Sequence, residues 1–273
     1  MPQLSLENHA LHYLATGNPS HPPLLLLHGF MGSCQDFTGV LSGLTEHFYC
    51  IVPDLPGHGE TLTNAGGYTF ERTAQALLAL LDYLGISQSQ LLGYSMGGRL
   101  ALYLVCYFPE RFRRVVLESA SPGLKTVEER QERIQRDQSL AHQLETTPLP
   151  DFLERWYNNP LFSKIKERPQ AYAEMLQRRQ NNNPTELAKA LRGMSTGRQP
   201  SLWPQLPNLK CTLSLLVGAL DPKFVAINRD MYTQCRPSQT TLTILEGCDH
   251  NLHLLAPEPY VKAINPLLLT ATP

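Results

Sequence analysis

The sequence LLGYSMGGR at residues 91–99 decides the fold. A run of leucines ends in a glycine-rich turn with Ser95 at its centre, and an apolar helical pattern follows the turn. A strand that passes through G-x-S-x-G into a helix is the setting of a nucleophile elbow, a strained turn that exposes a serine above a parallel sheet. The alternative is a glycine turn in which Ser95 only caps the helix. The rest of the chain has to distinguish the two interpretations.

Short apolar runs alternate with helical patterns along much of the chain. Phe70–Leu84 and Met96–Phe108 each repeat apolar residues on one helical face. The apolar runs are bounded by Gly, Pro or Asp, as buried parallel strands are, and they lie at Leu24–Leu27, Cys50–Val52, Gln90–Leu92, Val115–Leu117, Leu213–Val217 and Leu242–Leu245. This alternation predicts an α/β fold, with a mostly parallel central sheet and helices on both of its faces.

The alternation stops at Ser121, and strand runs resume only at residue 213. The intervening chain to about residue 207 is polar and helical. Prolines separate several short helices within it, at positions 148, 150, 160, 169 and 184. We therefore expect a single domain over residues 1–273, with a helical cap inserted at about 121–207.

Charge and composition narrow the classes of function. The 273 residues carry 23 Lys and Arg against 24 Asp and Glu, a formal net charge of -1, which gives no footprint for nucleic acid or an anionic membrane surface. The apolar runs are too short to span a bilayer, and the sequence opens without a signal-peptide pattern. The six cysteines lack C-x-x-C or zinc-like spacing. We expect a cytoplasmic protein without membrane insertion, metal or cofactor.

An activated serine needs a base, and the base needs an acid that orients it. On a sheet of this kind the chain order is Ser, Asp, His. Asp221 follows the strand run LSLLVGAL, and His250 follows TLTILEG. The sequence therefore predicts a triad of Ser95, Asp221 and His250.

Other acids and histidines compete for these roles. Glu118 also follows a strand run and stays open as the acid. Asp249 adjoins the predicted triad histidine in sequence, whereas the orienting acid normally comes from a separate loop. His253 lies in the next helical turn, where a structural role is more common. His58, in the turn DLPGHG at 54–59, is interpreted as part of a pocket rim.

Two backbone amides are candidates for an oxyanion hole. The N–H groups that follow the first buried strand and the nucleophile usually serve this purpose. His28-Gly29-Phe30 closes that strand, so the predicted donors are the amides of Phe30 and Met96.

Arg99 lies four residues after Ser95, which places it one helical turn away on the same face. A guanidinium beside a nucleophile favours an anionic substrate held by paired hydrogen bonds. The alternative is a salt bridge to an acid of the cap. The cap carries further arginines, most of which are interpreted as surface charges, at positions 130, 133, 136, 155, 168, 178, 179, 192 and 198.

The motifs LLLLHGFMGS, DLPGHGET, LLGYSMGG, GALDPKF and GCDHNLH together resemble the α/β-hydrolase superfamily over nearly the whole chain. The resemblance continues through the cap, where members of that superfamily differ most. It is carried there by SPGL at 121–124, then EERQER, WYNNPLF at 156–162, RRQNNN at 178–183 and GRQPSLWPQL at 197–206. These stretches are similar to the 2-succinyl-6-hydroxy-2,4-cyclohexadiene-1-carboxylate synthases of menaquinone and phylloquinone biosynthesis.

The resemblance implies an enzyme that eliminates pyruvate from a cyclohexene tricarboxylate, with Ser95 as the base. It carries the family's substrate-binding positions onto Tyr94, Arg99, Arg133, Trp156, Phe162 and Arg179. The register of the cap helices leaves Arg130 and Arg178 open as substitutes. Two other classes remain: a hydrolase of esters, thioesters or C–C bonds that works through an acyl-serine, and a non-catalytic binding module, which an ordered triad disfavours.

Overall fold

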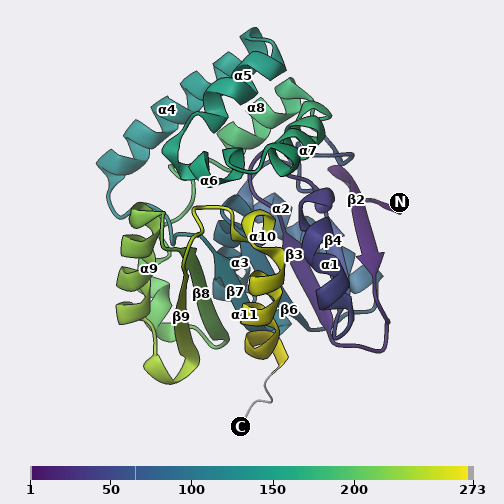
Figure 1. Ribbon diagram of the computed structural model, residues 1–273. Helices are drawn as coiled ribbons and strands as arrows, with labels where there is room; N and C mark the ends of the chain where they lie inside the picture. Colours follow the sequence, from purple (N-terminus) through teal and green to yellow (C-terminus); the bar gives the residue numbers. More distant parts are fainter. Residues whose placement is uncertain (1, 65, 270–273) are drawn as a thin grey trace.

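The computed structural model describes residues 2–64 and 66–269, whose strands form one sheet (Figure 1). The strand order is β1-β2-β4-β3-β6-β7-β8-β9, with β5 paired to β2. The pairs from β4 through β3 to β9 are parallel, and β2 is antiparallel to β1, β4 and β5. The strands are β1 (Gln3–Ser5), β2 (His9–Thr16), β3 (Pro23–Leu27), β4 (Tyr49–Pro53), β5 (Leu62–Thr63), β6 (Ser89–Tyr94), β7 (Phe112–Glu118), β8 (Thr212–Gly218) and β9 (Thr240–Leu245).

The six apolar runs lie within β3, β4, β6, β7, β8 and β9, so the α/β expectation with a mostly parallel sheet is confirmed. The antiparallel strands β1, β2 and β5 were not predicted. In β2 the buried side chains include His9 and His12, so this strand has no continuous apolar run. The Nδ1 atom of His12 lies 2.7 Å from Oδ2 of Asp54. This partner is distant in the sequence, so the residues around His12 do not indicate it.

Helices cover both faces of the sheet (Figure 1). On one face, α1 (Thr38–Thr45) and α11 (Pro257–Leu269) pack together and contribute Leu44 and Tyr260 to one core cluster. On the other face, α2 (Phe70–Tyr83), α3 (Met96–Tyr107) and α9 (Pro222–Gln234) contribute to a second cluster. No helix within residues 2–64 and 66–269 combines the length and apolar character needed to cross a bilayer.

The segment between β7 and β8 holds two short 3-10 helices (Pro160–Phe162 and Trp203–Asn208) and five α-helices, and the α-helices lie above the sheet in Figure 1. They are α4 (Val127–Thr146), α5 (Leu149–Tyr157), α6 (Ser163–Lys166), α7 (Pro169–Gln180) and α8 (Pro184–Gly193). Prolines stand in the first turns of α5, α7 and α8, where a missing N–H is harmless. We call residues 127–193, which contain these five α-helices and the turns between them, the cap. That core and cap unfold as one domain stays a prediction.

Candidate active site

Ser95 lies on a strained turn between β6 and α3. Its φ of 51° and ψ of -107° are unusual for a residue with a Cβ atom. The turn depends on close backbone approach, because a Cβ added at Gly97 would lie 2.2 Å from the carbonyl oxygen of Leu27. A Cβ at Gly93 would lie 2.5 Å from the carbonyl oxygen of Gly97. The G-x-S-x-G spacing therefore builds an elbow that presents the serine at the carboxyl end of the sheet.

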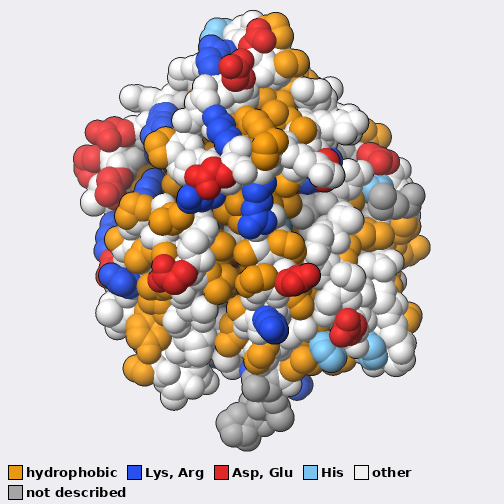
Figure 2. All heavy atoms as spheres, viewed as in Figure 1, with side chains coloured by type: hydrophobic (Ala, Val, Ile, Leu, Met, Phe, Trp, Pro, Cys, Tyr) orange, Lys and Arg blue, Asp and Glu red, His pale blue; other side chains and the backbone are white. Residues whose placement is uncertain are grey.

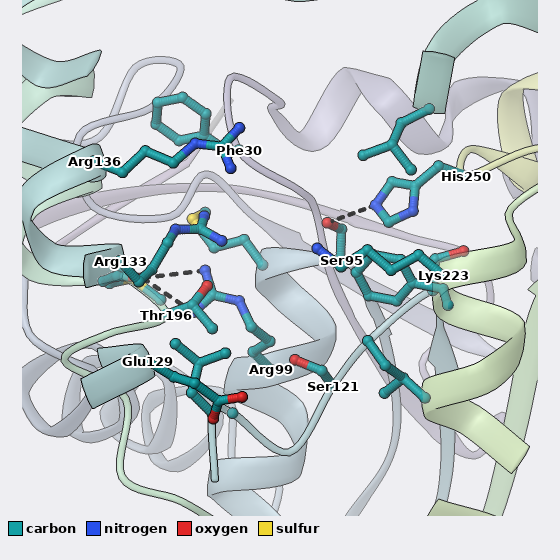
Figure 3. Close-up of a pocket in the computed structure, with 18 of the residues that line it drawn as sticks. Phe30, Ser95, Arg99, Ser121, Glu129, Arg133, Arg136, Thr196, Lys223 and His250 are labelled. Carbon is teal, nitrogen blue, oxygen red and sulfur yellow. Dashed lines mark hydrogen bonds between the residues drawn. The ribbon is translucent and has the colours of Figure 1, made fainter. Parts of the chain in front are cut away.

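The structure brings Ser95, His250 and Asp221 together. The Nε2 atom of His250 lies 3.0 Å from Oγ of Ser95 (Figure 3), and its Nδ1 lies 2.7 Å from Oδ2 of Asp221. Asp221 precedes α9, and its Oδ1 accepts a hydrogen bond from the amide of Phe224 (3.1 Å). Because the buried carboxylate holds Nδ1–H, Nε2 is left free to accept a proton from the serine.

The competing acids and His253 have other partners in this structure. Both carboxylate oxygens of Glu118 lie 2.9 Å from Nδ1 of His253, and Oε1 accepts the amide of Leu252 (2.8 Å). This pair anchors the start of α10 (Leu252–Leu255). Oδ2 of Asp249 accepts the amide of Lys164 (2.8 Å), and burial raises the pKa of that carboxyl. Glu118 and Asp249 thus brace the loop that carries His250 and do not orient its ring.

Phe30 and Met96 lie beside Ser95 in the wall of a cavity. The buried ring of His28 supports the Phe30 loop from behind. The amide of Leu55 donates to its Nε2 (2.9 Å), so its Nδ1 carries the proton and donates to the carbonyl of Gly29 (2.8 Å). Burial lowers the pKa of His28, and the imidazole is neutral. The positions of Phe30 and Met96 fit the predicted oxyanion hole.

His58 lies behind the same loop, with its ring centroid 5.6 Å from that of Phe30. Burial lowers the pKa of His58 to about 3. Its Nδ1 faces the carbonyl of Pro56 at 3.1 Å. A neutral histidine held in this way fits the structural role predicted for it.

The cavity above Ser95 has a volume of about 820 Å³ and is closed on one side by cap residues. Trp156 and Phe162, both predicted to bind substrate, line it. The ring of Trp156 lies 5.6 Å from that of Phe30, and the ring of Phe162 lies 6.0 Å from that of His250. Core and cap therefore share an aromatic wall around the triad.

Arg99 lines the same cavity and has only neutral hydrogen-bond partners (Figure 3). Its guanidinium donates to the carbonyl of Met194 (3.1 Å) and to Oε1 of Gln199 (3.2 Å). Among the described residues, no carboxylate forms a salt bridge with it, so the salt bridge considered as an alternative is not formed. Burial and the nearby Arg133 lower the pKa of Arg99 to about 9, although Asp137 opposes the shift. At neutral pH the group is a cation without a carboxylate in direct contact among the described residues.

Four further cations line the cavity, and one of them, Lys125, is paired with Asp230 (2.6 Å). Arg133, predicted as a substrate ligand, donates from Nε to Oδ1 of Asp137 (2.7 Å). Arg136 and Lys223 are more exposed and project from α4 and α9 (Figure 3). The sequence analysis did not single out Lys223, although it comes two residues after Asp221. That spacing places it in the first turn of the helix after the acid, at the edge of the site.

Two predicted substrate ligands lie away from the cavity. The ring of Tyr94 is buried with its centroid 4.8 Å from that of His253, and a Cβ on Gly29 would lie 2.6 Å from it. The guanidinium of Arg179 is buried and binds both oxygens of Asp36, at 2.6 and 2.7 Å. Tyr94 packs behind the triad, because the strained elbow directs the side chain of Ser95 toward the cavity and leaves that of Tyr94 in the core. Arg179 is occupied by a carboxylate of the core.

The two arginines kept open as substitutes also have protein partners. Nε of Arg130 donates to the carbonyl of Gly197 (3.1 Å), and Nε of Arg178 lies 4.0 Å from Oδ1 of Asp36. Neither residue lines the cavity. Elsewhere, basic and acidic side chains are interspersed on the cap surface shown in Figure 2, as expected for solvated charges.

One group of side chains has the composition of a metal site. The ligand atoms of His12, Cys34 and Asp54 lie within 4.8 Å of one another, and all three residues are buried. The carboxylate of Asp54 already accepts hydrogen bonds from the amides of Cys34 (2.6 Å) and Glu60 (2.9 Å) and contacts His12. With its lone pairs used in this way, Asp54 braces two loops and is poorly suited to a cation.

Comparisons with known proteins match the chain over most of its length. A Bacillus subtilis protein named as a candidate 2-succinyl-6-hydroxy-2,4-cyclohexadiene-1-carboxylate synthase is 37% identical, over 90% of this chain and 89% of its own length. The synthase of that name from Pectobacterium atrosepticum is 34% identical, over 92% of this chain and 95% of its own. The structure of MenH from S. aureus has a TM-score of 0.87 and 29% identity, and the match covers 96% of this chain and 98% of MenH.

The sheet, the elbow and a match of residues 22–257 to the alpha/beta hydrolase fold family define the class of this protein. It is an α/β-hydrolase fold protein in which Ser95, His250 and Asp221 are in hydrogen-bond contact at the carboxyl end of the sheet. Within that class, the chain belongs to the family of 2-succinyl-6-hydroxy-2,4-cyclohexadiene-1-carboxylate synthases, as the cap motifs predicted.

Proposed function

We propose that this protein is a carbon–oxygen lyase of menaquinone or phylloquinone biosynthesis. It eliminates pyruvate from 2-succinyl-5-enolpyruvyl-6-hydroxy-3-cyclohexene-1-carboxylate and forms 2-succinyl-6-hydroxy-2,4-cyclohexadiene-1-carboxylate. The observation that carries the proposal is the position of Arg99. This partly buried cation lies one helical turn after the nucleophile, and its hydrogen-bond partners are neutral. Such a group favours a substrate carboxylate, which would form the direct ion pair that the protein does not supply. A neutral ester would form no such ion pair.

The geometry supports proton abstraction by the serine hydroxyl. His250, oriented by Asp221, accepts the proton of Ser95 Oγ while that oxygen removes the ring proton beside the succinyl carbonyl. The electron pair of the C–H bond moves toward the carbonyl, whose growing negative charge the amides of Phe30 and Met96 stabilise. The pair then returns to form the C2=C3 bond of the ring, the π electrons of the C3=C4 bond shift to form C4=C5, and the C5–O bond to the enolpyruvyl group breaks.

The remaining steps balance the protons and release the products. The enolpyruvate oxygen takes the proton held by His250, and the released enol tautomerises to pyruvate. Ser95 keeps the ring proton as its new hydroxyl proton, so the serine and the histidine return to their starting protonation states. The cations at the cavity hold the carboxylates so that the reacting C–H bond lies against Ser95, which contributes by orientation as well as by binding.

The direct test is pyruvate release from the tricarboxylate, coupled to lactate dehydrogenase and NADH oxidation. We expect turnover by the protein as purified and only slow hydrolysis of p-nitrophenyl esters. The competing proposal is a hydrolase that uses the same triad through an acyl-serine. Fast ester turnover without pyruvate release would establish that alternative in place of the lyase.

Arg99→Ala is expected to lower kcat/KM for pyruvate release by about 2 kcal/mol, or about 30-fold, the scale of a lost charged hydrogen bond. Arg130→Ala is the matched control, because its guanidinium binds the carbonyl of Gly197 and lies outside the cavity. Steady-state kinetics of both variants measure the difference. Equal kcat/KM for the wild type and Arg99→Ala would show that this arginine serves only to hold Met194 and Gln199.

A further inference from the structure

The loop that carries Phe30 contains a strained turn. The amide of Gly32 donates to the carbonyl of Gly29 (3.0 Å), so residues 29–32 form a tight turn with Phe30 and Met31 at its centre. Met31 has a φ of 62°. A residue with a Cβ is disfavoured in this left-handed region, because the Cβ crowds the following carbonyl. Contacts from outside the turn must therefore hold it in this shape.

One such contact comes from the cap. Asn182, just after α7, is 6% exposed, and its Nδ2 donates to the carbonyl of Met31 (3.0 Å) and to that of Arg179 (3.2 Å). Its Oδ1 accepts the amide of Gly59 (3.0 Å). The opposite orientation of the amide would set Oδ1 against two carbonyl oxygens, so the partners fix how the side chain lies.

Other cap contacts reach this loop through side chains. Trp156 packs on the ring of Phe30, and Arg179 binds the carboxylate of Asp36 further along the loop. Neither contact constrains the peptide groups of the turn directly. The hydrogen bond from Asn182 does, because it fixes the carbonyl of the residue with the strained φ.

We propose that Asn182 is a positioning residue for catalysis: it holds the Met31 carbonyl so that the Phe30 amide stays aimed at the oxyanion beside Ser95. If Met31 relaxes toward negative φ, the peptide group before it rotates, and the Phe30 turn changes shape with it. The inference rests on the proposed function for its assignment of Phe30 as an oxyanion donor. Loss of one such donor typically lowers kcat by about 10²–10³-fold, so a misaimed donor acts on kcat more than on KM.

The test compares Asn182→Ala, Asn182→Asp and Asn183→Ala. We expect kcat for pyruvate release to fall at least about tenfold in both Asn182 variants, with KM changed less than about twofold. The aspartate keeps the shape and the acceptor for Gly59 and loses the donor to Met31. A wild-type kcat in Asn182→Asp would overturn the proposal. This variant therefore tests the proposal even if Asn182→Ala does not fold.

Asn183→Ala is the matched control. Asn183 caps α8 by accepting the amides of Thr185 (2.9 Å) and Glu186 (3.3 Å), without contact to the Phe30 turn. We expect this variant to melt at a lower temperature with unchanged kcat. A fall in kcat equal to that of Asn182→Ala would show that general loosening of the cap is responsible.

A second measurement separates this inference from the proposed function. A fluorophosphonate reacts with the nucleophilic serine and places its P=O oxygen in the oxyanion hole, so the labelling rate of Ser95 reports that hole without the natural substrate. We expect labelling of Asn182→Ala to be at least about tenfold slower than that of the wild type. Equal rates would overturn the positioning role. Slower labelling in a protein whose wild type releases no pyruvate would refute the lyase proposal and leave this inference standing.

Discussion

Ser95→Ala is expected to lower kcat for pyruvate release at least about 10²-fold, the lower end of what a general base contributes. The Oγ atom lies 3.0 Å from Nε2 of His250, and without it the imidazole has no group through which to take the ring proton. KM should change little, because Arg99, Arg133 and the aromatic wall remain in place. Pre-steady-state and steady-state pyruvate release both measure this loss.

The same experiment separates a base from a nucleophile. Because Ser95 and His250 act as a unit, His250→Ala should lose a similar factor, and the double variant should lose hardly more than either single one. Mass spectrometry during turnover should find no acyl-serine. A trapped adduct at Ser95 would contradict the base mechanism, and losses that multiply in the double variant would contradict the coupled pair.

Arg179→Met is expected to lower the free energy of unfolding by about 3–5 kcal/mol, the usual effect of removing one partner of a buried ion pair. The variant leaves the carboxylate of Asp36, which is 1% exposed, without its cation, and leaves Tyr157 without the Nε donor at 3.1 Å. Urea denaturation at neutral pH measures the change. A loss below about 1 kcal/mol would mean that water or a neighbouring group replaces the guanidinium.

Replacing both partners should restore most of that stability, because Arg179→Met with Asp36→Leu removes both of the buried charges. The pH dependence provides a second check. Burial acts to raise the pKa of Asp36, but Arg179 overcomes it, and the folded-state pKa is lowered. The pair's contribution is therefore present above the unfolded pKa of about 3.9 and is lost as pH falls through the lower folded value. In Arg179→Met only the weaker influence of His28 and His253 opposes burial, so the pKa of Asp36 should rise and the stability gap to the wild type should narrow on acidification.

Sequence patterns predicted the parts of the fold whose signals are local. The parallel strands are continuous apolar runs, and the elbow is a strand followed by glycines and a helix. β2 was not predicted, because its histidines are buried by hydrogen bonding to side chains far along the chain, such as Asp54 and Thr63. Hydrogen bonds of that kind form only in the folded protein. The alternation of apolar and polar residues along the sequence therefore gives no sign of this strand.

The candidate site likewise contains residues that the sequence predicts from local signals and residues that it does not. Ser95, Asp221 and His250 follow strands that end at one edge of the sheet, so strand order alone brings them together. The cap residues depend on the rotation of each helix about its axis. Two adjacent arginines at 178 and 179 differ by about 100° in direction, and both lie near Asp36 instead of the cavity. The direction of the Lys223 side chain could not be predicted, because it depends on the conformation of the turn after Asp221.

The contacts of Asn182 with Met31 and Gly59 have a consequence for protein engineering. Caps of α/β-hydrolase fold proteins are natural units for recombination, since one inserted segment supplies most of the substrate pocket. In this chain the end of α7 also supports the backbone of the core loop that faces the nucleophile. A chimera that exchanged residues 121–207 alone would receive a new pocket and lose the support of that loop. A working graft has to carry residues 29–36 and the turn at 54–60 with the cap, so the exchangeable unit is discontinuous in sequence.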